Sequence, residues 1–237
     1  MPLQMPSTRT TRTPRKPQPS LETKKQPAQQ RATETFERIL EVTAQTLADV
    51  GIERLSTNLV CERAGLTPPA LYRYFPNKYA LLYELGQRLM QKQNELIPRW
   101  ITPEVLTGSV EDLEGAIQGL LLDTHRVTQE TVGGMWITRA LRAVPALQKV
   151  RLESHEQVTH AQAEMLGAVF PGADIDELRL AGRVAVEMVY AAVELLFDEP
   201  LNAQAVAQIV SSMVASHLGR IQQAAAAPKK KRTKRAR

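Results

Sequence analysis

The chain has only one cysteine in 237 residues, so no disulfide can form within it. Aromatic residues make up 5% of the composition, and strand-like alternation of apolar and polar residues is scarce. No apolar run approaches the roughly 20 residues needed to cross a bilayer, because Glu187 and Glu194 interrupt the most apolar segment, 184–197. The N-terminus lacks the apolar stretch of a secretory signal. We therefore expect an all-α, cytoplasmic protein without a membrane segment.

Motifs that would indicate an enzyme or a metal site are also missing. There is no glycine-rich phosphate loop, no Gly-x-Ser-x-Gly motif and no His/Cys cluster with metal-ligand spacing. His155 and His160 would lie about 140° apart around a helix. Cys61 falls in a segment that we expect to be tightly packed, which is unsuitable for a nucleophile. We expect no enzymatic activity, no cofactor and no metal.

Charge is unevenly distributed along the chain. Residues 1–31 carry seven Lys or Arg and one Glu, net +6, and residues 228–237 carry seven basic residues and no acid, net +7. Residues 32–227 carry 16 basic and 24 acidic side chains, net −8. Basic ends on an acidic body are typical of a protein that binds a polyanion with one face.

Composition also divides the chain into parts. Both basic ends, 1–30 and 228–237, are expected to be disordered because they have little apolar surface to bury. Between them we expect a small N-terminal domain over 31–80 and a helical domain over 81–227, which starts with a rod-like connecting helix over 81–98. After a linker over 101–108, glycine and proline residues separate further expected helices at 110–129, 133–144, 146–169, 175–197 and 202–224.

The most specific pattern lies between residues 33 and 78. Apolar residues at helical spacing predict a supporting helix over 33–50, which stops at Gly51. Two short helices follow, the second from about Pro68 to Tyr74, with Gly65 as the turn residue between them. Cys61 is small enough for the close crossing of these two helices. The segment therefore meets the steric requirements of a DNA-binding helix-turn-helix.

The same segment, 38–82, resembles the TetR/AcrR family of transcriptional regulators. The resemblance rests on VCERAGLT at 60–67 and LYRYFPNK at 71–78, with Ile39-Leu40 and Gly51 before them and Leu81-Leu82 after them. Cys61 stands where the family usually has Ala, and Pro69 where it often has Gly, so a familiar operator sequence is not expected. The resemblance implies an N-terminal three-helix helix-turn-helix domain and a C-terminal helical domain that binds an effector and dimerises.

The family's docking geometry implies a set of DNA-binding residues. Those that would face the major groove are Asn58, Thr67, Pro68, Pro69 and Ala70, and those that would contact phosphates are Tyr72, Arg73, Tyr74 and Lys78. Asparagine can hydrogen-bond an adenine edge, whereas proline and alanine can contact only a thymine methyl group. Tyr72 and Tyr74 project from different faces of a short helix, so a core position for one of them stays open. Arg73 and Lys78 are alternatively solvated charges.

Two apolar seams in the C-terminal part predict helix pairing. They comprise Leu178, Ala181, Ala185, Met188, Ala192 and Leu195, and Val206, Val210, Met213, His217 and Ile221. Their spacing suits closely packed helices, and TetR-like proteins dimerise through a four-helix bundle. A homodimer would present two recognition helices to a palindromic operator. The alternative is that both seams only close the core of the monomer.

The resemblance further implies a pocket for a small-molecule effector of unknown identity. The candidates combine apolar walls with polar groups: Leu121, His125, Met135, Trp136, Arg139, Arg142, His155 and Tyr190. Arg139 and Arg142 would receive an acidic effector, or alternatively pair with surface glutamates. For His125, His155 and Trp136 the alternative is a structural role.

Two functions therefore stay open. The favoured one is a ligand-responsive repressor that binds double-stranded operator DNA in a bacterial nucleoid, repression being the family default. The other is architectural DNA binding through the basic tails. Arg9, Arg12, Arg15 and Lys16 in the N-terminal arm either enter the minor groove or only raise non-specific affinity. The stretch 228–232, PKKKR, resembles a nuclear import signal, which we interpret as coincidental.

Overall fold

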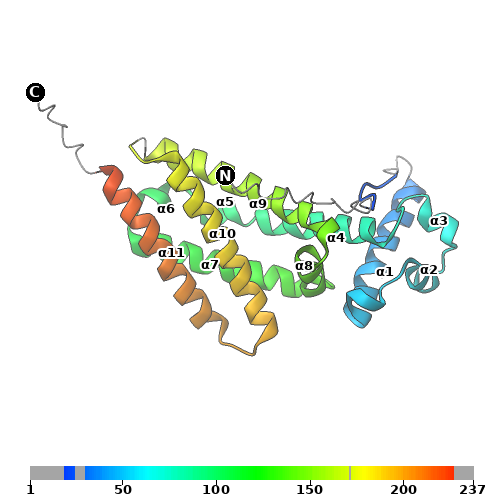
Figure 1. Ribbon diagram of the computed structural model, residues 1–237. Coiled ribbons are helices and arrows are strands. Elements are labelled where there is room, and N and C mark those ends of the chain that lie inside the picture. The colour runs from blue at the N-terminus through cyan, green and yellow to red at the C-terminus, as the bar shows by residue number, and fades with distance from the viewer. Residues whose placement is uncertain (1–18, 25–29, 171, 227–237) are drawn as a thin grey trace, which may run out of the picture.

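The computed structural model describes residues 19–24, 30–170 and 172–226, and every regular element in these ranges is a helix (Figure 1). In chain order the helices are α1 (Gln30–Arg54), α2 (Thr57–Ala64), α3 (Pro68–Tyr72), α4 (Lys78–Asn94), α5 (Ile97–Trp100), α6 (Pro103–Thr107), α7 (Val110–Glu130), α8 (Gly134–Ala143), the 3-10 helix η1 (Pro145–Leu147), α9 (Gln148–Val169), α10 (Ile175–Asp198) and α11 (Ala203–Ala226). The expected all-α fold class is confirmed. None of these helices is long and apolar enough to span a membrane.

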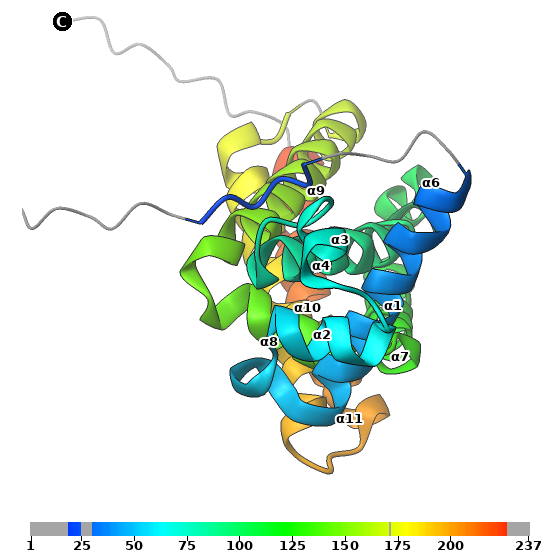
Figure 2. The same cartoon turned by 90° about the vertical axis from the view of Figure 1, so that its right-hand side faces the viewer.

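The N-terminal domain, α1 to α3, lies at one end of an elongated molecule and packs on the first turns of α4 (Figures 1 and 2). Local capping defines its short helices. The Ser56 side chain accepts a hydrogen bond from the backbone N–H of Leu59, and Gly65 ends α2 in the left-handed region, at φ 63°. The Asn77 side chain caps α4 by accepting bonds from the N–H groups of Tyr79 and Ala80.

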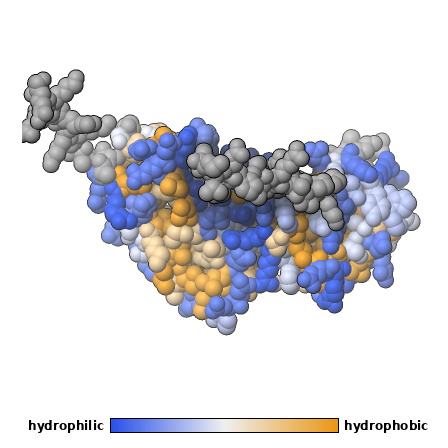
Figure 3. All heavy atoms as spheres, viewed as in Figure 1, coloured by the Kyte–Doolittle hydropathy of each residue, from blue (hydrophilic) through white to orange (hydrophobic). Residues whose placement is uncertain are grey.

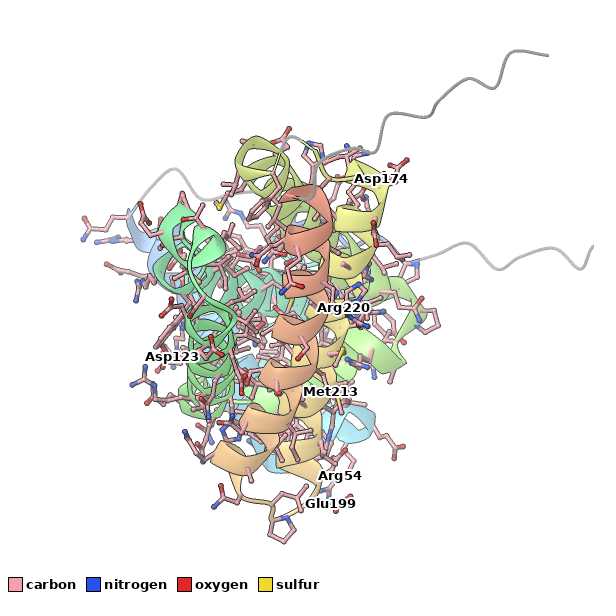
Figure 4. All side chains as sticks on the ribbon, turned by 90° about the vertical axis from the view of Figure 1, so that its left-hand side faces the viewer. Arg54, Asp123, Asp174, Glu199, Met213 and Arg220 are labelled. Atoms are coloured by element: carbon pink, nitrogen blue, oxygen red, sulfur yellow. The ribbon has the colours of Figure 1, made fainter. Side chains whose placement is uncertain are left out.

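The C-terminal domain is a bundle in which α7 pairs with α11 and α9 with α10 (Figures 1 and 4). Helix α4 runs out of the N-terminal domain and packs on both α7 and α9. Ser109 and Asp112 form a capping box at the start of α7, with each side chain bonded to the other's backbone N–H. The path of α4 makes it a shared element of the two domains.

Helix α8 is a second connection between the domains, because it contacts both α1 and α4. The Trp136 ring covers Gly51, where α1 kinks at φ 73°. A Cβ atom at Gly133, which has a φ of 70°, would lie 2.8 Å from the carbonyl oxygen of Ala44. Glycine at 133 thus permits close contact between the start of α8 and α1.

The course of the chain differs from the expected rod and linker. Helix α4 ends at Asn94 rather than at residue 98, and the expected linker contains α6. Pro98 explains the break, because it has no N–H to bond the carbonyl of Asn94 and its ring would clash there. The chain instead starts α5, with Pro98 in its first turn.

Part of the expected disordered arm is also ordered. The backbone N–H of Lys24 donates to the carbonyl of Tyr74 at 2.9 Å, and the Asn77 side chain donates to the carbonyl of Ser20 at 2.8 Å. Leu21, an apolar residue in this polar arm, packs on the N-terminal core. The rest of the arm, 1–18 and 25–29, and the tail over 228–237 lie outside the described residues.

Candidate DNA-binding surface and ligand cavity

Helices α2 and α3 form the end face of the molecule (Figure 2). Six of the expected DNA-binding residues are exposed there, namely Asn58, Thr67, Pro68, Pro69, Tyr72 and Arg73. Ala70 and Lys78 are half-buried. Helix α3 has only five residues and begins with two prolines, and both prolines are exposed.

Contacts behind this face hold the two helices in place. The hydroxyl groups of Thr57 and Tyr72 are 2.9 Å apart and join α2 to α3. Lys78 donates to the carbonyl of Leu55 at 3.3 Å, so this lysine also has a structural bond. Arg63 pairs with Asp49 of α1, and this hydrogen bond lowers the pKa of the Asp49 carboxyl. The surface is thus set by packing on α1.

Tyr74 and Cys61 belong to the interior. Tyr74 is 6% exposed, and its ring meets the Phe36 ring edge-on with centroids 6.0 Å apart. Because α3 ends at Tyr72 and the chain turns back there, residue 74 faces α1, and the expected phosphate contact by its side chain is replaced by a core role. Cys61 is buried at the helix crossing, and burial raises the pKa of its thiol.

A cavity of about 80 Å³ lies among α4, α7, α9, α10 and α11 and is partly open to solvent. Its walls are mainly leucine, isoleucine, valine and alanine side chains. The polar residues that line it are Gln93, Asn94, Thr124, Gln162 and Tyr190. No Asp, Glu, Lys, Arg or His is among the residues lining this cavity.

Of the expected pocket residues, only Tyr190 lines the cavity. Leu121 is fully buried in the core beside it. The His125 ring packs on the Phe197 ring with centroids 4.9 Å apart, and burial lowers the pKa of His125. Met135 is half-buried on α8, where Trp136 packs against Gly51 of α1. These side chains contribute to packing rather than to the cavity wall.

The two expected acid-binding arginines have protein partners. Arg139 pairs with Asp198 and lies over the Trp136 ring, 5.2 Å from its centroid. Arg142 pairs with Glu194 at 2.9 Å. The structure thus shows the alternative pairing with acidic residues and places neither guanidinium at the cavity.

His155 is 1% exposed and lies in a charged cluster beside the cavity. Arg183 and Arg151 donate to Glu187 at 2.7 Å and 2.8 Å, and His155 Nδ1 is 3.2 Å from the same carboxylate. Burial lowers the pKa of His155 to about 4, against the opposing attraction of Glu187, so the imidazole is neutral near pH 7. Its ring stacks on Tyr190 at 4.6 Å, which separates the cluster from the cavity.

A hydrogen-bond chain at the cavity wall was missed by sequence reasoning. Tyr190 donates to Gln93 at 3.1 Å, and Gln93 donates to Thr128 at 2.7 Å. Gln93 is buried and continues the row of Leu82 and Leu89 on α4. A polar residue in an apolar row was the available signal.

The outer faces of α10 and α11 carry exposed apolar side chains (Figures 3 and 4). Leu180 is 66% exposed, Ile209 57% and Met213 59%, and Val184 and Leu195 are also exposed. Figure 3 shows apolar surface gathered over these two helices, and Figure 4 labels Met213 on α11. We call these five residues the outer apolar face.

Most residues of the two expected apolar seams do not belong to the outer apolar face. Leu178, Ala181, Ala192 and Ile221 are buried within the protomer, while Ala185, Met188, Val206 and Val210 are half-buried. Only Leu195, Met213 and His217 of the expected set are exposed. The alternative interpretation therefore applies to the four buried residues, which pack within the core of the protomer.

Comparison with known proteins supplies a context for this geometry. Residues 39–85 match the family model described as bacterial regulatory proteins, tetR family. The tetracycline repressor protein class C of Escherichia coli is 41% identical over 54 residues, which is 23% of this chain and 25% of the repressor. The chain thus spans about a quarter of that relative's length.

Solved structures show the same fold over most of the chain. A TetR-family transcriptional regulator from Streptomyces coelicolor has a TM-score of 0.54 and 24% identity, covering 79% of this chain and 99% of its own. RolR, in a complex with the ligand resorcinol, has a TM-score of 0.53 and 16% identity, covering 84% of this chain and 96% of its own.

Proposed function

We propose that this chain, which matches the tetR family over residues 39–85 and shares the fold of TetR-family structures, is a transcriptional regulator that binds a palindromic operator as a homodimer and releases it when a small molecule occupies the cavity. Repression of transcription is the simplest consequence of such binding, since a protein seated on an operator excludes other proteins from it. The single observation that carries the proposal is the exposed α2–α3 face, held rigidly on α1.

The proposed DNA contacts come from this face. Asn58 and the start of α3, Thr67 to Ala70, are the side chains for base edges, and Tyr72, Arg73 and Lys78 are those for phosphates. The Arg73 backbone N–H bonds the carbonyl of Pro69, but its exposed guanidinium forms no hydrogen bond or ion pair with another described residue, which leaves its charge available. Tyr74 supports the face from behind.

The outer apolar face supports the homodimer. A contiguous exposed apolar surface is a common sign of a protein interface. Its members lie on two neighbouring helices, so two copies related by a twofold axis would form a four-helix contact. We infer that this face, rather than the buried seams, joins the protomers.

The cavity is placed to influence DNA binding. Gln93 and Asn94 line it from α4, the helix that continues into the N-terminal domain. Helix α8 offers a second route through Trp136 and Gly51. A ligand changes DNA affinity only if it binds one conformation better than another. We propose that ligand contact shifts α4 and α8 against α1 and so changes the spacing of the two recognition helices. RolR, whose fold is similar, was solved with resorcinol bound.

The test is base protection on DNA flanking the chain's own gene. We expect a protected palindrome and a preference over scrambled duplex of at least about 10³-fold at physiological salt. The protein without residues 1–18 and 227–237 is the key variant, since architectural binding through the tails would disappear with them. Equal affinity for promoter and scrambled duplex would refute operator recognition and favour the architectural function.

A further inference from the structure

We infer that the cavity binds a neutral, elongated, mainly apolar molecule with one uncharged hydrogen-bond donor, such as a hydroxyl group, at its end near Tyr190. This inference rests on the proposed function, because it specifies the ligand of the proposed regulator. It replaces the acidic effector that the sequence suggested. Three properties of the cavity carry it: its charge, its shape and its remaining hydrogen-bonding capacity.

The absence of charge among the lining residues excludes ionic ligands. A buried carboxylate or ammonium group needs a partner of opposite charge, and none of the lining residues supplies one. Arg151 and Arg183 are bound to Glu187 in the cluster around His155, whose ring stacks on Tyr190 of the cavity wall. His155 is itself neutral near pH 7. An ionic ligand would therefore lose its hydration without compensation.

The lining residues of α7 show that the cavity is long. Leu113, Ile117, Leu120 and Thr124 follow one another at helical spacing along a single face. At 1.5 Å per residue they span about 16 Å of helix. The first three are apolar, and Thr124 lies at the end towards Tyr190 and Gln93, whereas Gln162 lines the cavity further along, beside Gly182. The lining suits a long apolar body with one polar terminus.

The free hydrogen-bonding capacity at that terminus favours a donor on the ligand. The Tyr190 hydroxyl already donates to Gln93, and burial raises its pKa, so it keeps its proton and can only accept from a ligand. Both ends of the Gln93 amide are in use. Asn94 donates to Ser154 at 3.0 Å, and its Oδ1 has no partner among the described residues. The Tyr190 hydroxyl and Asn94 Oδ1 can therefore each accept a hydrogen bond from a donor on a ligand at this end of the cavity.

The experiment uses the full-length protein and the uncharged fluorescent probe N-phenyl-1-naphthylamine. Displacement is measured at pH 7.5 with 1-decanol, decanoate, decylammonium and decyl methyl ether, which share one chain and differ at the end. We expect 1-decanol to displace the probe at a concentration at least about tenfold below that of either ion. The ether, which has no donor, should be several-fold weaker than the alcohol. Equal or tighter binding of an ion would overturn the inference.

Variants link the preference to the cavity. Tyr190→Phe should weaken 1-decanol several-fold and leave the ether unchanged, whereas Tyr83→Phe, on the same α4 helix as Asn94 but outside the cavity, should change neither. Gln162→Lys should strengthen decanoate about tenfold by adding the missing cation, and Gln162→Met should not. If Gln162→Lys leaves decanoate binding unchanged, the probe occupies another site and the inference fails.

Operator binding of the ligand-free protein separates this inference from the proposed function. If specific DNA binding stands while an ion outcompetes 1-decanol, only the ligand class is wrong. If 1-decanol is preferred but no DNA is bound specifically, the inferred ligand class stands and the regulator function fails.

Discussion

Replacing Leu180 with alanine should weaken the homodimer and leave the protomer intact. Leu180 is 66% exposed on α10, so its side chain contributes little to the core of the isolated protomer. Alanine is also a good helix former, so the substitution should not destabilise α10. Any effect on assembly then reports the outer apolar face.

The magnitude follows from the exposed fraction and from symmetry. Full burial of a leucine side chain is worth about 1.5–3 kcal/mol. With about two thirds of the side chain left to bury, each copy contributes about 1–2 kcal/mol, and a twofold axis doubles this to about 2–4 kcal/mol. The dimer dissociation constant should therefore rise by about 30-fold to several hundred-fold.

Sedimentation equilibrium over a range of protein concentrations measures this constant directly. The matched control is Leu152→Ala, because Leu152 is 45% exposed on α9 and lies outside the outer apolar face. The control should dimerise like the parent protein. The interface assignment is refuted if Leu180→Ala changes the constant less than about threefold, or if only Leu152→Ala weakens the dimer.

Three further predictions concern other parts of the chain. Arg73→Gln should reduce the slope of log K for operator DNA against log salt by about 0.9, the value for one phosphate contact, and the exposed Arg99→Gln on α5 should leave the slope unchanged. Gly65→Ala should lower the free energy of unfolding in urea by about 1 kcal/mol, because Gly65 has a φ of 63°. The control Gly115→Ala, whose added Cβ meets nothing within 4 Å, should be neutral or stabilising. Equal effects of the two substitutions would contradict this prediction. His155 has a folded pKa of about 4 against an ordinary 6.5, so the unfolded chain binds its proton more readily and stability falls as pH drops from about 6.5 to 4. His155→Gln should flatten that part of the pH profile, and an unchanged slope in urea titrations would refute the burial argument.

The DNA-binding end was predictable because its signals are local. Gly51, Ser56, Gly65 and Asn77 act on backbone groups within a few residues of themselves, and each occupies the turn or cap that its chemistry suits. Tyr74 was harder to assign, since two tyrosines only two positions apart at the end of a short helix do not show from sequence alone which ring faces α1. The packing of Phe36 against it decides that.

The helices of the C-terminal domain could be predicted from the sequence, but which of their faces are buried and which are exposed could not. Both sides of α10 are apolar, so spacing alone cannot tell a core row from an interface row. Only the neighbouring helices α7, α9 and α11 show that Leu178 and Ala181 point inwards and that Leu180 and Val184 point outwards. Likewise, Arg139 and Arg142 could be assigned to a ligand until Asp198 and Glu194, more than fifty residues along the chain, were seen beside them.

The amino-acid sequence by itself determined the helical class, the helix-turn-helix and the residues that end its helices, because these depend on contacts between near neighbours in the chain. Tertiary structure alone decided which face of α10 is free, which polar side chains line the cavity and which charges are already paired. Those properties depend on residues brought together from distant parts of the chain, and local sequence patterns do not predict such long-range contacts.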